Sequence, residues 1–174
     1  QVGGEGGERG GEALRLRRGN LERAGGVRHV RVERVVLEQM STFLNNVLHI
    51  SALNDSTAPY RFAYELMIRR HAFGRFEDLL VEASLHPAMR MYLDNRLSVK
   101  GKPNENQGRE LLELHSVSRA AGYSEAEVLD SAKILSGYTI DWGKSYAAVY
   151  DTKRHTTGPV SVLGFTDANT DPDG

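Results

Sequence analysis

Residues 86–138 read HPAMRMYLDNRLSVKGKPNENQGRELLELHSVSRAAGYSEAEVLDSAKILSGY, and this stretch holds the clearest helix boundaries in the chain. Pro103 cannot lie inside a helix, and Asn104 is a preferred N-cap residue. Glu105 then suits the positive end of the helix dipole. The sequence therefore predicts a helix from Asn104 to about Val117.

Successive helical residues lie ~100° apart, which divides this helix into two faces. The polar face groups Glu105, Asn106, Arg109, Glu110 and Glu113. The opposite face groups Gly108, Leu111, Leu112, Leu114 and His115. A residue as small as glycine lets another element approach closely, so we predict packing through the face that contains Gly108.

The polar face has two interpretations. Glu105, Arg109 and Glu113 are spaced four residues apart, and a solvated ladder of this kind contributes little stability. In the second interpretation the face is buried, and Arg109 organises the two carboxylates and a loop carbonyl near Asn95. On this basis we predict a large loss of stability for Arg109→Ala. His115 is interpreted as a structural histidine without metal dependence.

Helical spacing of apolar residues and helix-capping residues predict about five helices between residues 35 and 137. The other predicted helices cover about 35–48, 58–71, 75–85 and 124–136, and residues 87–95 are predicted to form a further short helix. The helix over 124–136 begins with a capping box, Ser124 and Glu127, and ends at Gly137. The apolar stripe of the first is formed by Val36, Met40, Phe43 and Val47. Apolar residues surround the segment 58–71, which predicts burial on several sides.

We predict an all-α fold, an irregular helical domain over residues 35–165. Glycine and charge replace apolar periodicity in residues 1–34, so this Gly/Arg-rich segment is predicted to be a disordered tail. The segment beyond Tyr138 is predicted to be irregular, although residues 160–163 are β-prone and Tyr150 could belong to a short strand. Residues 166–174 are predicted to fray.

Composition limits the classes of function. The 174 residues carry a formal net charge of −1, which gives no electrostatic support for binding to nucleic acid. Cysteine is absent, so disulfides and thiolate zinc sites are excluded. No apolar run is long enough to form a transmembrane segment. No signal peptide is recognisable, and no residues point to a particular cofactor or metal.

The central stretch resembles a bacterial family, domain of unknown function 1800. The matching motifs are Gly74-Arg75-Phe76, His86-Pro87-Ala88-Met89, Tyr92-Leu93-Asp94-Asn95, Asn104-Glu105-Asn106 and Arg109-Glu110-Leu111-Leu112-Glu113-Leu114-His115. Later matching positions are Gly122-Tyr123, Gly137, His155, Gly158 and Leu163-Gly164. The resemblance covers about residues 40–165, whereas residues 1–34 do not resemble the family.

The resemblance implies an internal fragment of a longer, mostly helical protein that is exported to the periplasm or the extracellular space. It also implies a sulfatase-like companion protein, but no activity. The sequence departs from the family pattern at Val47, where the family has His, and at Thr156, where it has Asp. Gln107-Gly108 replaces Tyr-Ala, and Ser116-Val117-Ser118 replaces Thr-Leu-Gly. If the missing His and Asp are functional, this copy is expected to be inactive.

Two functions follow as hypotheses. The preferred one is a helical scaffold or binding component of an exported system, in which a structural polar cluster ties the preceding loop to the helix. That cluster comprises His86, Asn104, Glu105, Asn106 and Arg109. The alternative is an exported hydrolytic or metal-assisted enzyme. Its candidate catalytic residues are Glu110, Glu113, His115 and His155.

Overall fold

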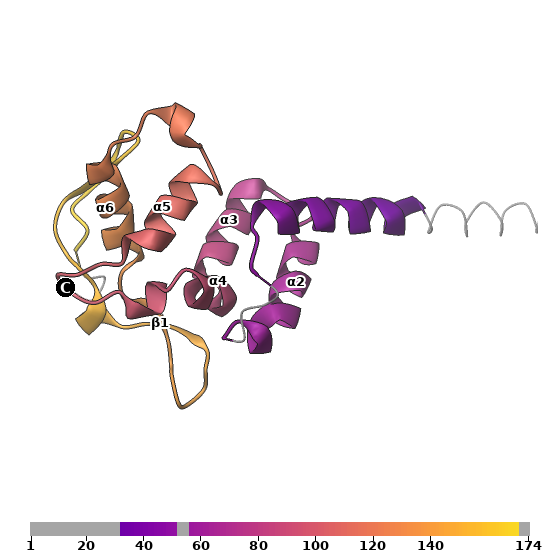
Figure 1. The fold of residues 1–174 in the computed structure, drawn as a ribbon, viewed down its shortest axis with the longest axis horizontal. Coiled ribbons are helices and arrows are strands. Elements are labelled where there is room, and N and C mark those ends of the chain that lie inside the picture. The colour runs from indigo at the N-terminus through magenta and orange to yellow at the C-terminus, as the bar shows by residue number, and fades with distance from the viewer. Residues whose placement is uncertain (1–31, 52–55, 171–174) are drawn as a thin grey trace, which may run out of the picture. The chain divides into compact units, whose positions relative to one another are not determined.

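A computed structural model describes residues 32–51 and 56–170 (Figure 1). The chain divides into two compact units, residues 1–40 and residues 41–174. In the first unit the described residues, 32–40, are helical. The predicted tail, residues 1–34, lies almost entirely outside the described residues, and only its last three residues are seen, in the helix.

The second unit is mostly helical and follows the predicted punctuation. Residues 41–47 are helical, and the later α-helices are α2 (Arg61–Arg70), α3 (Phe76–Leu85), α4 (Pro87–Tyr92), α5 (Glu105–Glu113) and α6 (Glu125–Leu135). Single 3₁₀ turns are η1 (Ala58–Tyr60), η2 (Asn95–Leu97), η3 (Arg119–Ala121) and η4 (Thr152–Arg154). The predicted helices therefore exist, and the prediction of a mostly helical protein is confirmed.

The all-α prediction is wrong in one respect, because two small antiparallel sheets follow the helices. The first pairs β1 (Tyr138–Ile140) with β2 (Ala148–Tyr150), and Thr139 lies opposite Val149. The second pairs β3 (Val160–Val162) with β4 (Phe165–Asp167). Strands of three residues are too short to show an alternating pattern. This lack of a pattern explains why the segment after the last helix was predicted to be irregular.

The first hairpin is held by side chains from the helical part. Arg90 of α4 is only 3 % exposed, and its Nη1 donates to the carbonyl oxygens of Thr139 at 2.7 Å and Val149 at 3.3 Å. Its guanidinium also lies over the Tyr138 ring, 5.3 Å from the centroid. Burial lowers the pKa of Arg90 to about 10, so this arginine remains charged at neutral pH. The hairpin is therefore positioned by α4.

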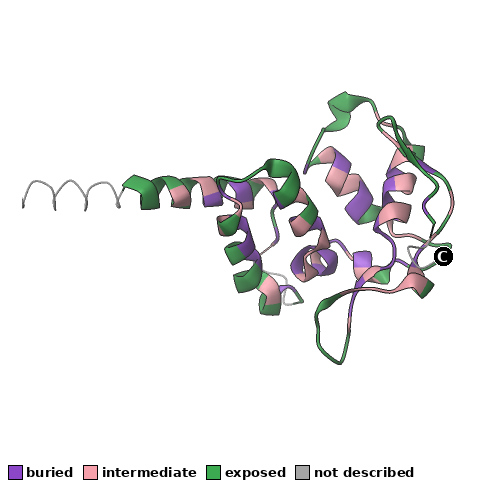
Figure 2. Ribbon diagram, turned by 180° about the vertical axis from the view of Figure 1, so that it is seen from behind, coloured by how far each residue is buried: buried purple, intermediate pink, exposed green. Residues whose placement is uncertain are grey.

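Helices α5 and α6 lie side by side, as the prediction for Gly108 requires (Figure 1). A Cβ atom added to Gly108 would lie 2.9 Å from the Ala132 nitrogen and 3.1 Å from the Val128 oxygen. Both contacts are with the backbone of α6, so even a methyl group would force the helices apart. Leu112, Val128 and Ala132 are buried around this contact (Figure 2).

Some predicted core positions are exposed. Phe43 is exposed, and the buried positions along this segment are Ser41, Leu44 and Leu48. On α2, likewise, Tyr64, Met67 and Ile68 are buried, while Phe62 and Leu66 are exposed. The burial predicted on several sides of 58–71 is thus confined to one side within this unit. Apolar spacing identified the helices but not which apolar stripe is covered.

Helix α5 ends at Glu113, four residues before the predicted end. The amides of Val117 and Ser118 both donate to the Leu112 carbonyl oxygen, which turns the chain away from the helix axis. Ser118 has φ 61° and ψ 168°, a backbone conformation that is almost exclusive to glycine. The related family pattern has Gly at this position, so Ser118 carries strain that the pattern avoids.

Ser118→Gly is expected to stabilise the protein. Relief of the backbone strain is worth ~1–3 kcal/mol. The loss of the long 3.3 Å hydrogen bond from the Ala120 amide to Ser118 Oγ offsets part of that gain. We expect the free energy of unfolding in urea to rise by ~0.5–2 kcal/mol. Ser116→Gly, at a position without positive φ, is the control and should destabilise; equal effects at both positions would exclude the strain.

The C-terminal segment is more ordered than predicted. Thr166 and Asp167 lie in β4 rather than in a frayed end. Asn169 is buried, and its Nδ2 donates to the Thr156 carbonyl oxygen at 2.8 Å. The remainder of the predicted frayed end, residues 171–174, lies outside the described residues.

The turn between β1 and β2 presents two aromatic side chains. Trp142 and Tyr146 meet edge to face with centroids 5.5 Å apart, and Trp142 is 64 % exposed. Asp141 fixes the turn by accepting from the Ser145 hydroxyl at 2.9 Å and from the Ser145 amide at 3.3 Å. Tyr60 Oη donates to the Tyr146 carbonyl oxygen at 3.1 Å, which ties the turn to η1.

Candidate functional site

The Asn-Glu-Asn motif fastens a loop to the start of α5. Asn104 caps the helix by accepting from the Asn106 amide at 2.9 Å, while its Nδ2 donates to the Asp94 carbonyl oxygen at 3.2 Å. Asn106 Nδ2 donates to the Leu93 carbonyl oxygen at 3.3 Å. These bonds join α5 to the segment that follows α4. The two asparagines therefore tie the start of α5 to the backbone at Leu93 and Asp94.

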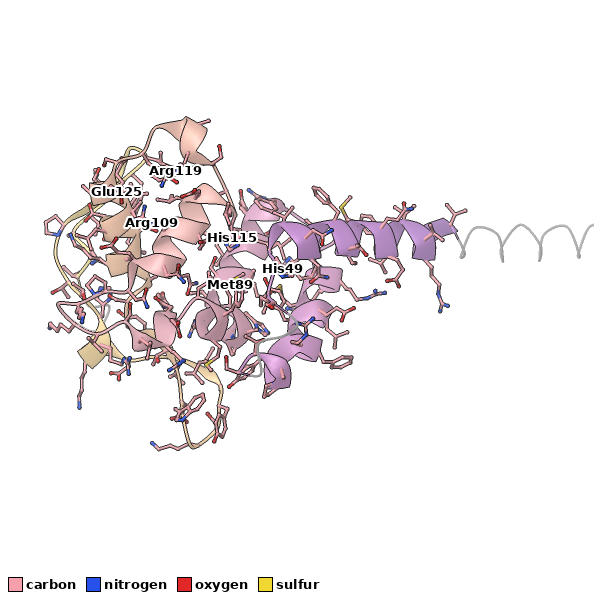
Figure 3. All side chains as sticks on the ribbon, viewed as in Figure 1. His49, Met89, Arg109, His115, Arg119 and Glu125 are labelled. Carbon is pink, nitrogen blue, oxygen red and sulfur yellow. The ribbon has the colours of Figure 1, made fainter. Side chains whose placement is uncertain are left out.

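Arg109 does not occupy the buried network predicted for it. It donates to Glu105 at 3.3 Å and to Glu125 of α6 at 2.6 Å, at the surface (Figure 3). Glu113 instead pairs with Arg119, whose Nε lies 3.1 Å from it. The hydrogen bonds between Arg109 and Glu125 raise the pKa of Arg109 and lower the pKa of Glu125. The solvated interpretation of this face fits the contacts better.

Arg109→Ala is accordingly expected to cost little stability, which reverses our expectation from the sequence. Exposed ion pairs are weakened by water and salt, so removing one changes the folded state only slightly. Urea denaturation of Arg109→Ala should match that of Arg119→Ala, a control from the neighbouring surface pair. A large loss of unfolding free energy that persists at high salt would instead support the buried interpretation of this face.

His86 of the predicted polar cluster acts as the N-cap of α4. Its Nδ1 accepts from the Ala88 amide at 3.1 Å, and its ring meets Tyr64 edge to face at 5.1 Å. Burial lowers the pKa of His86 to about 4, with a further lowering by Arg90 and an opposing effect of Glu82. A neutral imidazole is what the cap requires, because a protonated Nδ1 cannot accept.

The pKa of His86 predicts acid sensitivity. Because the folded-state pKa is depressed, its contribution to stability is complete above the ordinary pKa of ~6.5 and is lost as the pH falls towards 4. Partial exposure reduces the expected loss to ~1–2 kcal/mol. His86→Asn keeps an accepting cap that does not titrate, so this variant should lose less stability than the parent between pH 7 and pH 4. Equal losses of unfolding free energy in the parent and in His86→Asn between pH 7 and pH 4, measured by urea denaturation, would contradict the assignment.

His155 is a buried histidine beneath the first hairpin. Its Nδ1 lies 3.0 Å from the Ser136 carbonyl oxygen and 3.3 Å from the Ser136 hydroxyl, whereas its Nε2 has no hydrogen-bond partner among the described residues. Gly137 has φ 86° and approaches the His155 Cβ and the Tyr150 ring too closely for a side chain. His155 therefore belongs to the packing between α6 and the hairpin.

Glu110 and His115 line one cleft of about 460 Å³. Its polar walls also include Asn46 and His49, and the Tyr92 ring meets that of His49 edge to face at 6.4 Å. His115 is only 8 % exposed, and burial lowers its pKa. The side chains of His49 and His115 come from segments far apart in the sequence (Figure 3). This cleft is the candidate functional site.

The structure thus brings together two of the four predicted catalytic candidates. Glu113 faces Arg119 and His155 packs under the hairpin, so neither lines the cleft. Sequence analysis missed His49, because nothing in a single sequence connects it to Glu110 and His115, which lie far from it along the chain. Among residues 32–51 and 56–170, no three or more His, Cys, Asp or Glu side chains are placed to hold a metal ion.

Together these features define a mostly helical protein in which a polar helix start is tied to a loop beside a polar cleft. The chain belongs to the family described as "Protein of unknown function (DUF1800)", whose model matches residues 12–174. The match begins within residues 1–34, so our expectation that this segment differs from the family is wrong from residue 12 onward. No curated protein and no solved structure matches the chain. In the described part of the chain, no helix has the length and apolarity to cross a membrane.

Proposed function

We propose that this chain is a helical scaffold or binding component that works with a companion protein. The proposal is supported chiefly by the use made of the polar motif. The side chains of Asn104 and Asn106 donate hydrogen bonds to loop carbonyls, and that of Arg109 donates to two glutamates. Residues bonded in this way hold a surface in shape. They are not placed to transfer protons to a substrate.

A second support is the exposed apolar side of α2. Phe62 is 74 % exposed and Leu66 is 50 % exposed, and the two are one helical turn apart. Large aromatic and aliphatic side chains of this kind provide much of the binding energy in protein interfaces. In our proposal a sulfatase-like companion, suggested by the family resemblance, covers this side in an exported complex.

The test measures binding between the purified chain and a sulfatase-like protein encoded beside it, by biolayer interferometry. The double variant Phe62→Ser with Leu66→Ser should weaken binding by about tenfold or more, since each lost anchor costs ~1 kcal/mol or more. Val117→Ser, an exposed apolar residue in the loop after α5, is the control. Failure of the unaltered chain to bind would overturn the proposal, as would equal affinity of all variants.

A hydrolytic enzyme is the second candidate function, favoured by one observation. Glu110 and His115 line the same cleft, and a carboxylate with a neutral imidazole can serve as acid and base. Hydrolysis of nitrophenyl esters, phosphates and sulfates would test it. Glu110→Gln should abolish any activity and Glu113→Gln should leave it unchanged. Activity that survives Glu110→Gln would remove this cleft from consideration.

A further inference from the structure

The cleft beside α5 contains charged and polar side chains that the fold leaves without partners. Helix α5 carries three glutamates, and two are paired within the described residues, Glu105 with Arg109 and Glu113 with Arg119. Glu110 makes no ion pair or side-chain hydrogen bond there, and no lysine or arginine of the described residues lines the cleft. Its carboxylate is therefore an uncompensated negative charge on the wall of a cleft.

His115 is the second unpartnered group in the cleft. The residue is only 8 % exposed, lines the cleft, and its side chain makes no hydrogen bond within the described part of the chain. Its ring nitrogens are not among the described buried atoms that lack a partner, so the ring is open to a ligand from the cleft. Because burial lowers its pKa, the ring is neutral near pH 7 and presents one donor and one acceptor nitrogen. A neutral ring does not repel a cation.

Apart from Asn46 and His49, the remaining walls are apolar and aromatic. Val47, Leu93 and Leu114 provide aliphatic surface, and the Tyr92 ring is half-buried beside them. An aromatic face attracts a cation electrostatically, and aliphatic walls accommodate a methylene stem. Arg61 lines an adjoining hollow that shares Asn46 and His49, where its Nη1 donates to the Ile50 carbonyl oxygen at 3.3 Å. It is thus engaged outside this cleft.

We propose that the cleft binds an ammonium or guanidinium group carried on a short apolar stem. Glu110 supplies the counter-charge, the acceptor nitrogen of His115 receives one N–H, and Tyr92 with the aliphatic walls holds the stem. This chemistry belongs equally to a free alkylamine and to a lysine or arginine side chain of a peptide. The site does not depend on the companion proposed for the α2 surface.

The test uses the full ¹⁵N-labelled chain and three probes, followed by nuclear magnetic resonance. The probes are n-butylammonium, the neutral control 1-butanol, and a peptide with one central lysine. Butylammonium should saturably shift the ring nitrogen signals of His115 and the backbone amide signal of Tyr92, whereas butanol should not. Equal effects of the two small probes would overturn the proposal, because the charge would then be irrelevant.

Two variants on the same helix locate the charge. Glu110→Gln is isosteric at a partly buried position, and it should weaken butylammonium binding by about tenfold or more, the loss expected for a charged hydrogen bond. Glu113→Gln removes a neighbouring carboxylate that faces Arg119 and should leave affinity unchanged. Equal affinities of both variants would overturn the site.

The peptide identifies the source of the cation. If the peptide binds about tenfold more tightly than butylammonium and also loses affinity in Glu110→Gln, the occupant is a side chain of another protein, because flanking backbone adds contacts. If the peptide binds no better than butylammonium, the occupant is a small amine. Either result supports a cation site. If neither butylammonium nor the peptide binds, the proposal is overturned.

Discussion

Asn95→Asp is expected to lower the free energy of unfolding by ~3–5 kcal/mol, because two buried carbonyls would lose their donor. Asn95 is 1 % exposed, and its Nδ2 donates to the carbonyl oxygens of Leu135 at 2.9 Å and Tyr138 at 3.0 Å. Leu135 is the last residue of α6, where carbonyls lack intrahelical partners. Aspartate keeps the shape of the side chain but places oxygen against oxygen.

Urea denaturation followed by circular dichroism measures this loss. Asn106→Ala is the matched comparison, because Asn106 makes one longer side-chain bond, to the Leu93 carbonyl oxygen at 3.3 Å, and should cost ~1 kcal/mol or less. If Asn95→Asp costs no more than Asn106→Ala, then Asn95 does not hold the end of α6 and the start of β1 together.

Gly108→Ala is expected to destabilise by ~1–3 kcal/mol, although alanine is the better helix former. A Cβ at this position would meet backbone atoms of α6 at 2.9 and 3.1 Å, and backbone cannot move aside as a flexible side chain can. Helix propensity alone predicts the opposite sign, a gain of ~1 kcal/mol. The sign of the change therefore decides whether packing or propensity controls this position.

The variant can be measured by urea denaturation, with Glu110→Ala as a control for helix propensity on the same helix. The Glu110 side chain makes no hydrogen bond or ion pair within the described residues, so its replacement should change stability only slightly. A stabilised Gly108→Ala would show that α5 and α6 can separate without loss, and that their close approach is not required.

Local signals were sufficient for most helices. The capping box of α6 is present as predicted, with the Ser124 amide 2.7 Å from Glu127 Oε2 and the Glu127 amide 3.3 Å from Ser124 Oγ. Its partners are three residues apart, so the sequence contains the whole interaction. The β1–β2 hairpin depends instead on Arg90 and Asn95, which are distant in sequence, and no local pattern contains that support.

The candidate site was predicted less well for the same reason. Spacing on a single helix led us to pair Arg109 with Glu105 and Glu113, yet its closest carboxylate belongs to Glu125 of another helix. Glu110 and His115 were identified as candidates from their residue types. His49 joins them only through the folding of an earlier segment against α4 and α5, and that arrangement cannot be read from one sequence.

The exposed Trp142 has a consequence for spectroscopy. It is the single tryptophan of the chain and lies on the turn between β1 and β2, largely in water. An indole already in contact with solvent changes its emission maximum little when the chain unfolds. Tryptophan fluorescence will therefore report chiefly local opening of the turn, where the Arg96 guanidinium lies 6.0 Å from the ring centroid. Unfolding that separates α5 from α6 will be detected by circular dichroism, whereas the tryptophan emission will hardly change.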